Sequence, residues 1–205
     1  MPESPKTLKS LFDFYYDYVK LLYAVVSADN VLPQEVLFEI HAALDHVSRI
    51  YTYGESEEKA VAKAYGHLKR SCLDIFKIEF KKLSEQYADL MRVDISIVDN
   101  GDFEKNVRLE FAKIKQLAKE ARQFEGKNSV GRSKPPEAFD KWYQVFDKGQ
   151  KFEKDFLLSP KVDWARLKDK TITRKTFYLS VAASIVASLI VGAVSSTAIQ
   201  NLFGP

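Results

Sequence analysis

The segment from residue 177 to residue 199 contains 23 consecutive residues without a charged side chain. As an α-helix this segment is about 35 Å long, which is enough to cross a hydrocarbon core of about 30 Å. The alternative is a helix buried in a protein core, but such helices are usually shorter and less uniformly apolar. The segment therefore predicts one C-terminal transmembrane helix over residues 176–200.

Basic residues gather just before this segment, whereas the last six residues, QNLFGP, carry no charge. The basic residues of the 161–175 stretch are Lys161, Arg166, Lys168, Lys170, Arg174 and Lys175, against Asp163 and Asp169. Because positive flanks stay on the cytoplasmic side of a membrane helix, we expect the large N-terminal part to be cytoplasmic. The chain would then be a single-pass, tail-anchored protein of the inner membrane, with the lipid bilayer as its first partner.

Small residues recur every fourth position in the apolar segment. They are Ser180, Ser184, Ser188, Gly192 and Ser196. Close contact between helices in lipid depends on small side chains and on hydroxyl groups that bond across the interface. A repeat of four drifts by about 40° per step around a helix of 3.6 residues per turn, so the stripe winds around the helix. The pattern favours self-association into a homo-oligomer, with plain anchoring as the alternative.

Apolar residues at helical spacing run through the first 160 residues, and no stretch has the pattern of a strand. Caps and breaks predict five helices, at about 5–28, 33–54, 56–92, 103–124 and 135–158, the first of them capped by Ser4 and Pro5. Long helices joined by short turns bury their apolar stripes in a bundle. We therefore expect an all-α fold: a bundle over residues 1–160, a basic juxtamembrane linker over 161–175, and the membrane helix.

Composition excludes several classes of chemistry. The net charge of +3 is small and the charges are mixed along the chain, so nucleic acid is not an expected partner. The single cysteine, Cys72, rules out a disulfide within the chain and a multi-cysteine metal site, and it fits a small buried thiol. The sequence contains no glycine-rich phosphate loop and no paired histidines for zinc. We expect no metal, no cofactor and no catalytic residue.

Two neighbouring helices carry polar residues that a hairpin could bring together. His46 and Arg49 lie on the second helix, and His67, Arg70 and Asp74 lie on the third. Counted outward from the turn near Gly54, the two histidines stand at similar heights, so these residues could form a polar cluster. The alternative, which we favour, is one imidazole satisfied inside the bundle and arginine–aspartate pairs on its surface.

The stretch GHLKRSCLD, residues 66–74, is similar to helices of small helical proteins in bacterial antiviral defence, and the hairpin resembles the HEPN class of RNases. The active site of that class needs an Arg, a polar residue and a His four to six positions after the Arg, and no Arg precedes a His at that spacing here. The resemblance therefore implies a helical module attached to a membrane effector, without the catalytic motif.

These observations favour a membrane-anchored effector of an abortive-infection type, which self-associates and perturbs or perforates the bilayer. An adaptor is the alternative, in which the tail only tethers a module that recruits a cytosolic partner. A HEPN-like ribonuclease is the third and weakest interpretation, because its motif is missing.

Overall fold

The protein is represented by a computed structural model, which describes residues 4–28, 33–128 and 137–203, and the side chains of 4–28, 33–126, 138–171 and 174–188 within them. In chain order the elements are α1 (Leu8–Phe14), the π-helix η1 (Tyr15–Val19), α2 (Lys20–Val26), α3 (Gln34–Thr52), α4 (Glu57–Leu90), the 3-10 turn η2 (Asp99–Gly101), α5 (Asp102–Asn128), α6 (Glu137–Phe152), the π-helix η3 (Glu153–Leu157) and α7 (Pro160–Phe203).

Within these ranges every long element is a helix and none is a strand, which confirms the all-α class. The elements α1, η1 and α2 follow one another without a break and form the first helix. With α3, α4, α5 and α6 this makes the five helices expected for the bundle, and α7 follows them.

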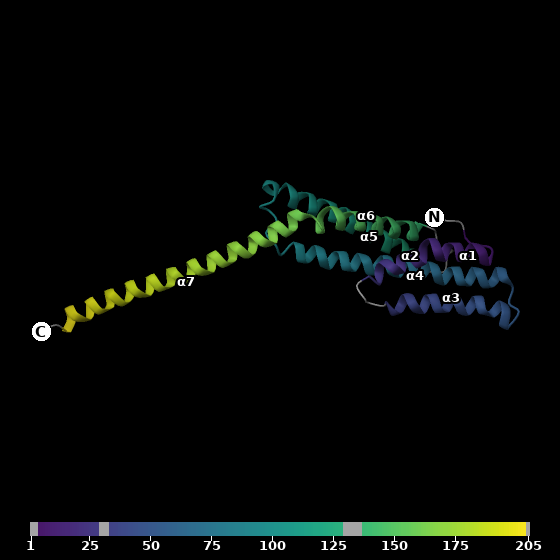
Figure 1. Ribbon diagram of the computed structural model, residues 1–205, viewed down its shortest axis with the longest axis horizontal. Coiled ribbons are helices and arrows are strands. Elements are labelled where there is room, and N and C mark those ends of the chain that lie inside the picture. The colour runs from purple at the N-terminus through teal and green to yellow at the C-terminus, as the bar shows by residue number, and fades with distance from the viewer. Residues whose placement is uncertain (1–3, 29–32, 129–136, 204–205) are drawn as a thin grey trace.

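The longest bundle helix, α4, runs through the middle of the molecule (Figure 1). The first helix and α3 pack along its N-terminal half, whereas α6 packs along its C-terminal half and carries α5 on another side. The core between them is apolar and includes the fully buried side chains of Phe76, Ile75 and Trp142. Each helix thus buries one stripe against α4 or α6, as amphipathic helices of this length do.

The first helix departs from regular α-helical spacing. Phe14 and Val19 are both buried, although they lie five residues apart, which is more than one turn of 3.6 residues. The π-turn η1 absorbs the extra residue, with the Lys20 N–H donating to the carbonyl of Tyr15, so both side chains face the core. In an uninterrupted α-helix Phe12, two turns before Val19, would share its buried face. Here Phe12 is instead 48% exposed.

The start of the first helix corrects the capping predicted at Ser4 and Pro5. The N-cap is Thr7, whose hydroxyl accepts a hydrogen bond from the Ser10 backbone N–H in a capping box. The Leu8 N–H, one of the amides that a helix start leaves free, donates to the Glu57 carboxylate at 2.8 Å. This bond joins the start of the first helix to the start of α4.

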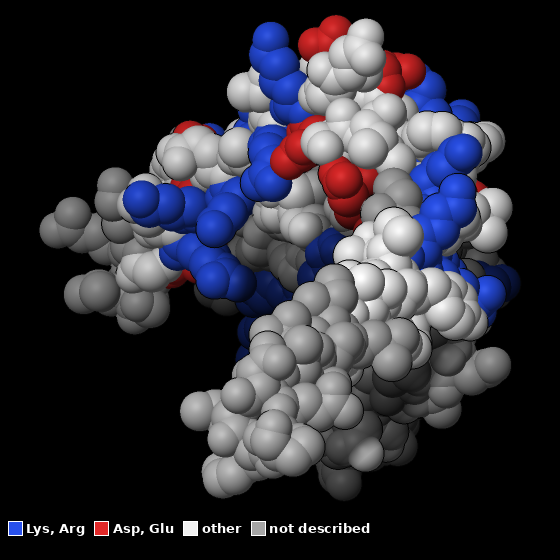
Figure 2. Space-filling view, turned by 90° about the vertical axis from the view of Figure 1, so that its left-hand side faces the viewer, with Lys and Arg blue, Asp and Glu red and all other residues white. Residues whose placement is uncertain are grey.

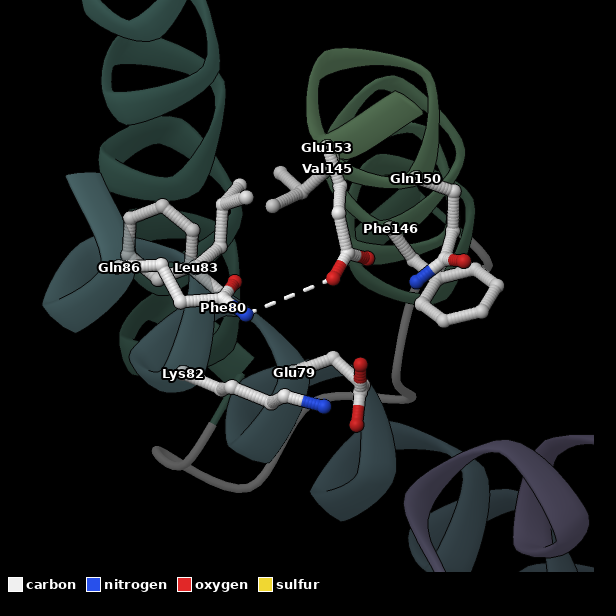
Figure 3. A pocket seen from close by; sticks show the side chains of 10 residues that line it. Glu79, Phe80, Lys82, Leu83, Gln86, Val145, Phe146, Gln150 and Glu153 are labelled. Atoms are coloured by element: carbon white, nitrogen blue, oxygen red, sulfur yellow. Dashed lines mark hydrogen bonds between the residues drawn. The ribbon is translucent and has the colours of Figure 1, made fainter. Parts of the chain in front are cut away.

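The contact between α4 and α6 is close because Gly149 has no side chain. A Cβ at that position would lie 3.2 Å from Cδ2 of Leu83. Beside this contact, the Gln86 side-chain amide donates to Glu153 at 3.4 Å (Figure 3). The cavity that these residues line has a volume of about 10 Å³, which holds no more than about one water molecule.

The first two turns of α7 are part of the bundle. Val162 and Ala165 are fully buried, and Lys161 forms an ion pair with Asp99 in the turn η2. The Lys161 ammonium also lies 5.7 Å from the centre of the Phe103 ring. The stretch expected to be a linker, residues 161–175, is thus helical and continuous with the apolar segment after it.

In the part of the chain that the structure describes, no helix was found to be long and apolar enough to cross a membrane. Of the uncharged stretch 177–199, the side chains after Ser188 lie outside the described residues.

Candidate functional site

Beyond its docked turns, α7 leaves the bundle as a single rod (Figure 1). Every side chain from residue 174 to residue 188 is exposed, including the large apolar ones of Phe177, Tyr178 and Leu179, at 63%, 69% and 70%. Nothing in the described part of the chain covers them. The rod therefore presents a continuous apolar surface that begins where the charges end.

The basic residues expected beside the membrane fall into two groups. Those nearest the bundle have partners: Lys161 pairs with Asp99, Arg166 lies 3.8 Å from Asp163, and the Lys168 ammonium lies 5.6 Å from the Trp164 ring centre. The later ones, Lys170, Arg174 and Lys175, are exposed and form no ion pair with a described side chain. Figure 2, which looks along α7 toward the bundle, shows Lys and Arg side chains on both sides of the helix.

The described part of the small-residue stripe is exposed, and its hydroxyls are satisfied within α7. Ser180 donates to the Phe177 carbonyl, Ser184 to the Ser180 carbonyl and Ser188 to the Ser184 carbonyl, each at 2.8 Å. Bonds of this kind leave no free hydroxyl donor on the helix surface. Because these side chains are small and their hydroxyls are already bonded, the backbone of another helix can approach the stripe closely. The remaining members, Gly192 and Ser196, lie outside the described side chains.

A polar cluster lies on the α3–α4 hairpin. The structure brings His46 and His67 together, with ring centres 5.2 Å apart and planes inclined by 31°. Glu39, about two helical turns before His46 on α3, is at the centre of the cluster: its Oε2 atom lies 2.7 Å from Nδ1 of His67 and 3.0 Å from Nε of Arg70. One carboxylate thus holds two side chains of the neighbouring helix.

The contacts of His67 Nδ1 depend on where the proton resides. A terminal guanidinium nitrogen of Arg70 lies 2.7 Å from this atom, the same distance as Glu39 Oε2. With a proton on Nδ1 the ring donates to Glu39, and without it the same atom accepts from Arg70. The two hydrogen bonds exclude each other, so the cluster has two arrangements of its protons.

Two groups of the cluster have shifted pKa values. Burial acts to raise the pKa of Glu39, but the hydrogen bonds from His67 and Arg70 outweigh it, so this pKa is lowered. Burial, followed by the positive charges of His67, Lys63 and Arg49, lowers the pKa of His46. Nδ1 of His46 is buried and has no hydrogen-bond partner among the described residues.

The other two predicted members of the cluster pair elsewhere. Arg49 binds Asp45 on its own helix, at 2.7 Å, and Asp74 lies 3.6 Å from Lys77. Glu39 is absent from the residues expected from the sequence. It precedes His46 by seven residues, about two helical turns, and this same-face spacing is the signal that identifies it.

The lone thiol has no place in acid–base or nucleophilic chemistry here. Cys72 is fully buried, and burial raises its pKa to about 12. A thiol of this kind is protonated near neutral pH and has no nucleophilic thiolate. Among the described side chains, no group of three or more His, Cys, Asp or Glu residues is placed to hold a metal ion.

Comparisons of the chain with models of known families, with curated proteins and with solved structures found no match in any of the three. The resemblance to the HEPN class thus stays an expectation drawn from the sequence alone.

Proposed function

We propose that this chain is a membrane-anchored effector. Its bundle lies in the cytoplasm, α7 enters the inner membrane at about residue 176, and the α7 helices of several copies associate and perturb the bilayer. The exposed apolar rod is the observation that supports this proposal: Phe177, Tyr178, Leu179, Ile185 and Val186 are all at least 55% exposed. Continuous apolar surfaces of this kind mark membrane or protein contacts.

The charges at the base of the rod fit a bilayer surface. Lys170, Arg174 and Lys175 precede the first apolar turn and have no acidic partner among the described residues. Each basic residue near an anionic leaflet contributes about 1 kcal/mol of attraction. Trp164 and Tyr178, 46% and 69% exposed, have the amphipathic rings that favour the headgroup region.

The continuity of α7 favours an effector over an adaptor. A tether needs only a flexible linker, which lets a recruited module move freely. Here one helix begins in the bundle core, at Val162 and Ala165, and continues into the apolar segment. A rotation of the bundle would therefore turn the membrane segment with it, which is what an effector that responds to assembly requires.

The small-residue stripe supports association of the tails. Ser180, Ser184 and Ser188 follow one another at intervals of four, and their hydroxyls already bond within the helix. Packing of backbones is then the main attraction between two such helices in lipid. The antiviral setting implied by the HEPN resemblance would supply the trigger of the assembly.

The helical continuity can be tested in cells. We would express the full chain in bacteria and follow membrane potential with a voltage-sensitive dye. A flexible insertion of about four Gly and Ser residues after Lys170 should keep the protein in the membrane but abolish depolarisation, because it uncouples the bundle from the tail. An insertion of the same length in the 129–136 segment is the control.

An adaptor predicts the opposite result. The response of the cells to the full chain would then be the same with the flexible insertion. It would also be the same after exchange of residues 177–199 for an unrelated membrane helix. Absence of depolarisation by the unaltered chain at any expression level would also contradict the effector proposal.

A further inference from the structure

An open groove of about 980 Å³ lies between α4 and α5. These two helices each pack against α6, so at this level the described part of the bundle has three helices and one side that no described helix covers. The groove is independent of α7 and of the proposed membrane role.

The floor of the groove is aromatic. The rings of Tyr87 on α4 and Phe111 on α5 are stacked, with centres 3.8 Å apart and planes inclined by 6°. Phe80, about two turns before Tyr87 on α4, also lines the groove, and its ring centre lies 6.2 Å from that of Trp142. An apolar floor between two helices is the surface on which a further amphipathic helix packs.

One border of the groove is basic. Lys115, Lys119 and Arg122 occupy one face of α5 at spacings of four and three residues, and all three are exposed. None forms an ion pair with a described side chain, whereas Arg108 and Lys113 of the same helix pair with Glu104 and Glu110. The residues that line the groove include no carboxylate.

The chain does not supply the missing charge from nearby. Glu120, between the basic residues, binds Lys141 on α6 at 2.7 Å, and Glu125 binds Lys77 at 2.9 Å. The 129–136 segment that follows α5 contains Arg132 and Lys134 and no acidic residue. A ligand with acidic side chains would therefore complement the charge of this border.

We infer that the groove between α4 and α5 binds an amphipathic helix of a partner protein, with an apolar stripe on the Tyr87–Phe111 floor and acidic residues opposite Lys115, Lys119 and Arg122. Such a helix completes a four-helix arrangement with α4, α5 and α6. The groove borders α5 from Phe111 to Gln123, so a partner helix of about 14 residues, roughly 20 Å long, fills it.

Nucleic acid fits the groove less well. Single-stranded nucleic acid binds by stacking its bases on free aromatic faces. Here Tyr87 and Phe111 stack on each other, and Phe111 is only 7% exposed. The floor offers apolar area for side chains rather than open ring faces for bases.

The test uses the full chain in a non-ionic detergent and a fluorescent synthetic peptide of about 14 residues, with Leu at helical spacing and Glu along one border. Binding is followed by fluorescence anisotropy. We expect saturable binding that weakens as salt rises from about 50 to about 300 mM, because the charges contribute to it. A scrambled peptide of the same composition and a version with Lys in place of Glu should not bind.

Two kinds of variants locate the binding site. Reversal of the three charges, Lys115→Glu with Lys119→Glu and Arg122→Glu, should weaken binding about tenfold or more. Lys105→Glu, on an exposed residue of the same helix outside the groove, should leave it unchanged. Ala112→Trp adds a large side chain to an exposed position of the groove and should block the peptide without a change of charge.

Equal binding by the chain and by the charge-reversed and Ala112→Trp variants would overturn the proposal. A single-stranded RNA oligonucleotide that binds more tightly than the peptide, displaces it and loses affinity in the same variants would also overturn the proposal. The groove would then be a nucleic-acid site. Absence of peptide binding by the unaltered chain would contradict it as well.

Discussion

Glu39 is the residue that connects α3 to α4 electrostatically. Its carboxylate bonds to His67 and Arg70, and its own side chain is 25% exposed. Since Arg70 is 41% exposed, water weakens part of this interaction. The cluster should stabilise the hairpin modestly and make its stability depend on pH.

Glu39→Gln should lower the free energy of unfolding at pH 7 by about 1 kcal/mol, because the neutral amide oxygen accepts weaker hydrogen bonds than the carboxylate and loses the attraction to the charge of Arg70. The folded pKa of Glu39 is lowered, so its contribution is complete above the ordinary value of 4.5 and is lost as pH falls through the folded pKa. Urea unfolding followed by the fluorescence of the buried Trp142 measures this. The variant and the wild type should converge as pH falls below 4.5 and through the lowered pKa of Glu39; a constant difference at all pH values would contradict the assignment.

His46→Leu should have the reverse effect. Nδ1 of His46 is buried without a partner, so its replacement by an apolar side chain should leave stability at pH 8 unchanged or raise it by about 1 kcal/mol. Because the folded pKa of His46 is lowered below 6.5, the unfolded chain binds more protons in that range and the wild type loses stability there. The advantage of the variant should therefore grow from about pH 7 to about pH 5 in the same urea experiment. A variant less stable than the wild type at both pH values would show that the imidazole makes an essential contact.

Sequence spacing places His46 and His67 at similar heights, because heights on an antiparallel hairpin can be counted from its turn, but the interpretation favoured from the sequence is one satisfied imidazole with arginine–aspartate pairs on the surface. It does not assign Glu39 a role, since a carboxylate on an amphipathic helix also fits a solvated face. Arg49 illustrates the other limit: its neighbour Asp45, one turn away on the same helix, binds it at 2.7 Å. Local pairs of this kind compete with contacts across the hairpin.

At the scale of the elements, helix spans follow from caps, turns and periodicity. The spans of α3, α4 and α5 lie within a few residues of those that the sequence predicts. The π-turn η1 escapes prediction, because apolar spacing at a period of 3.6 residues assigns Phe12 rather than Phe14 to the buried face. The packing of Phe14 against Tyr65, with ring centres 5.0 Å apart, is a tertiary contact that local spacing does not contain.

Gly66 and Gly149 both lie within helices, but only Gly149 lies where α6 packs closely on α4. Replacement by alanine should therefore change stability differently at the two positions. Gly66→Ala, where an added Cβ meets no atom within 4 Å, should stabilise the bundle by about 0.5–1 kcal/mol through helix propensity. Gly149→Ala should gain less or destabilise, because the Cβ meets Leu83 at 3.2 Å and Leu83 is buried. Urea unfolding of the two variants side by side measures the difference. An equal gain in both would mean that α6 can move away from α4 at no cost.

The small-residue stripe of α7 makes a prediction for assembly. Leucine at Ser184, Ser188 and Gly192 favours insertion by about 0.3–0.6 kcal/mol per residue but prevents close approach of backbones. Crosslinking in membranes should show fewer oligomers for this triple variant, whereas leucine at Val181 and Ile185 should change little. An unaltered crosslinking pattern in the triple variant would indicate that the stripe only fills the helix or that the bundles hold the assembly.

At the scale of the whole molecule, the chain joins two parts of different character through one helix. The bundle buries its apolar side chains around α4, whereas α7 exposes them over residues 177–188. The junction is firm, because Val162 and Ala165 are fully buried and Lys161 binds Asp99. What covers the exposed part of α7 therefore decides whether the chain acts at a membrane.

Alkaline extraction of membranes tests this most directly. The full chain and Leu109→Arg, a control that adds a charge at an exposed apolar position of α5, should stay in the membrane pellet. The double variant Ile185→Arg with Val186→Arg should be released, because each arginine near the centre of a membrane helix costs about 2.5–3.5 kcal/mol. Release of the unaltered chain by alkali, or retention of the double variant at the level of the control, would contradict a membrane-inserted α7.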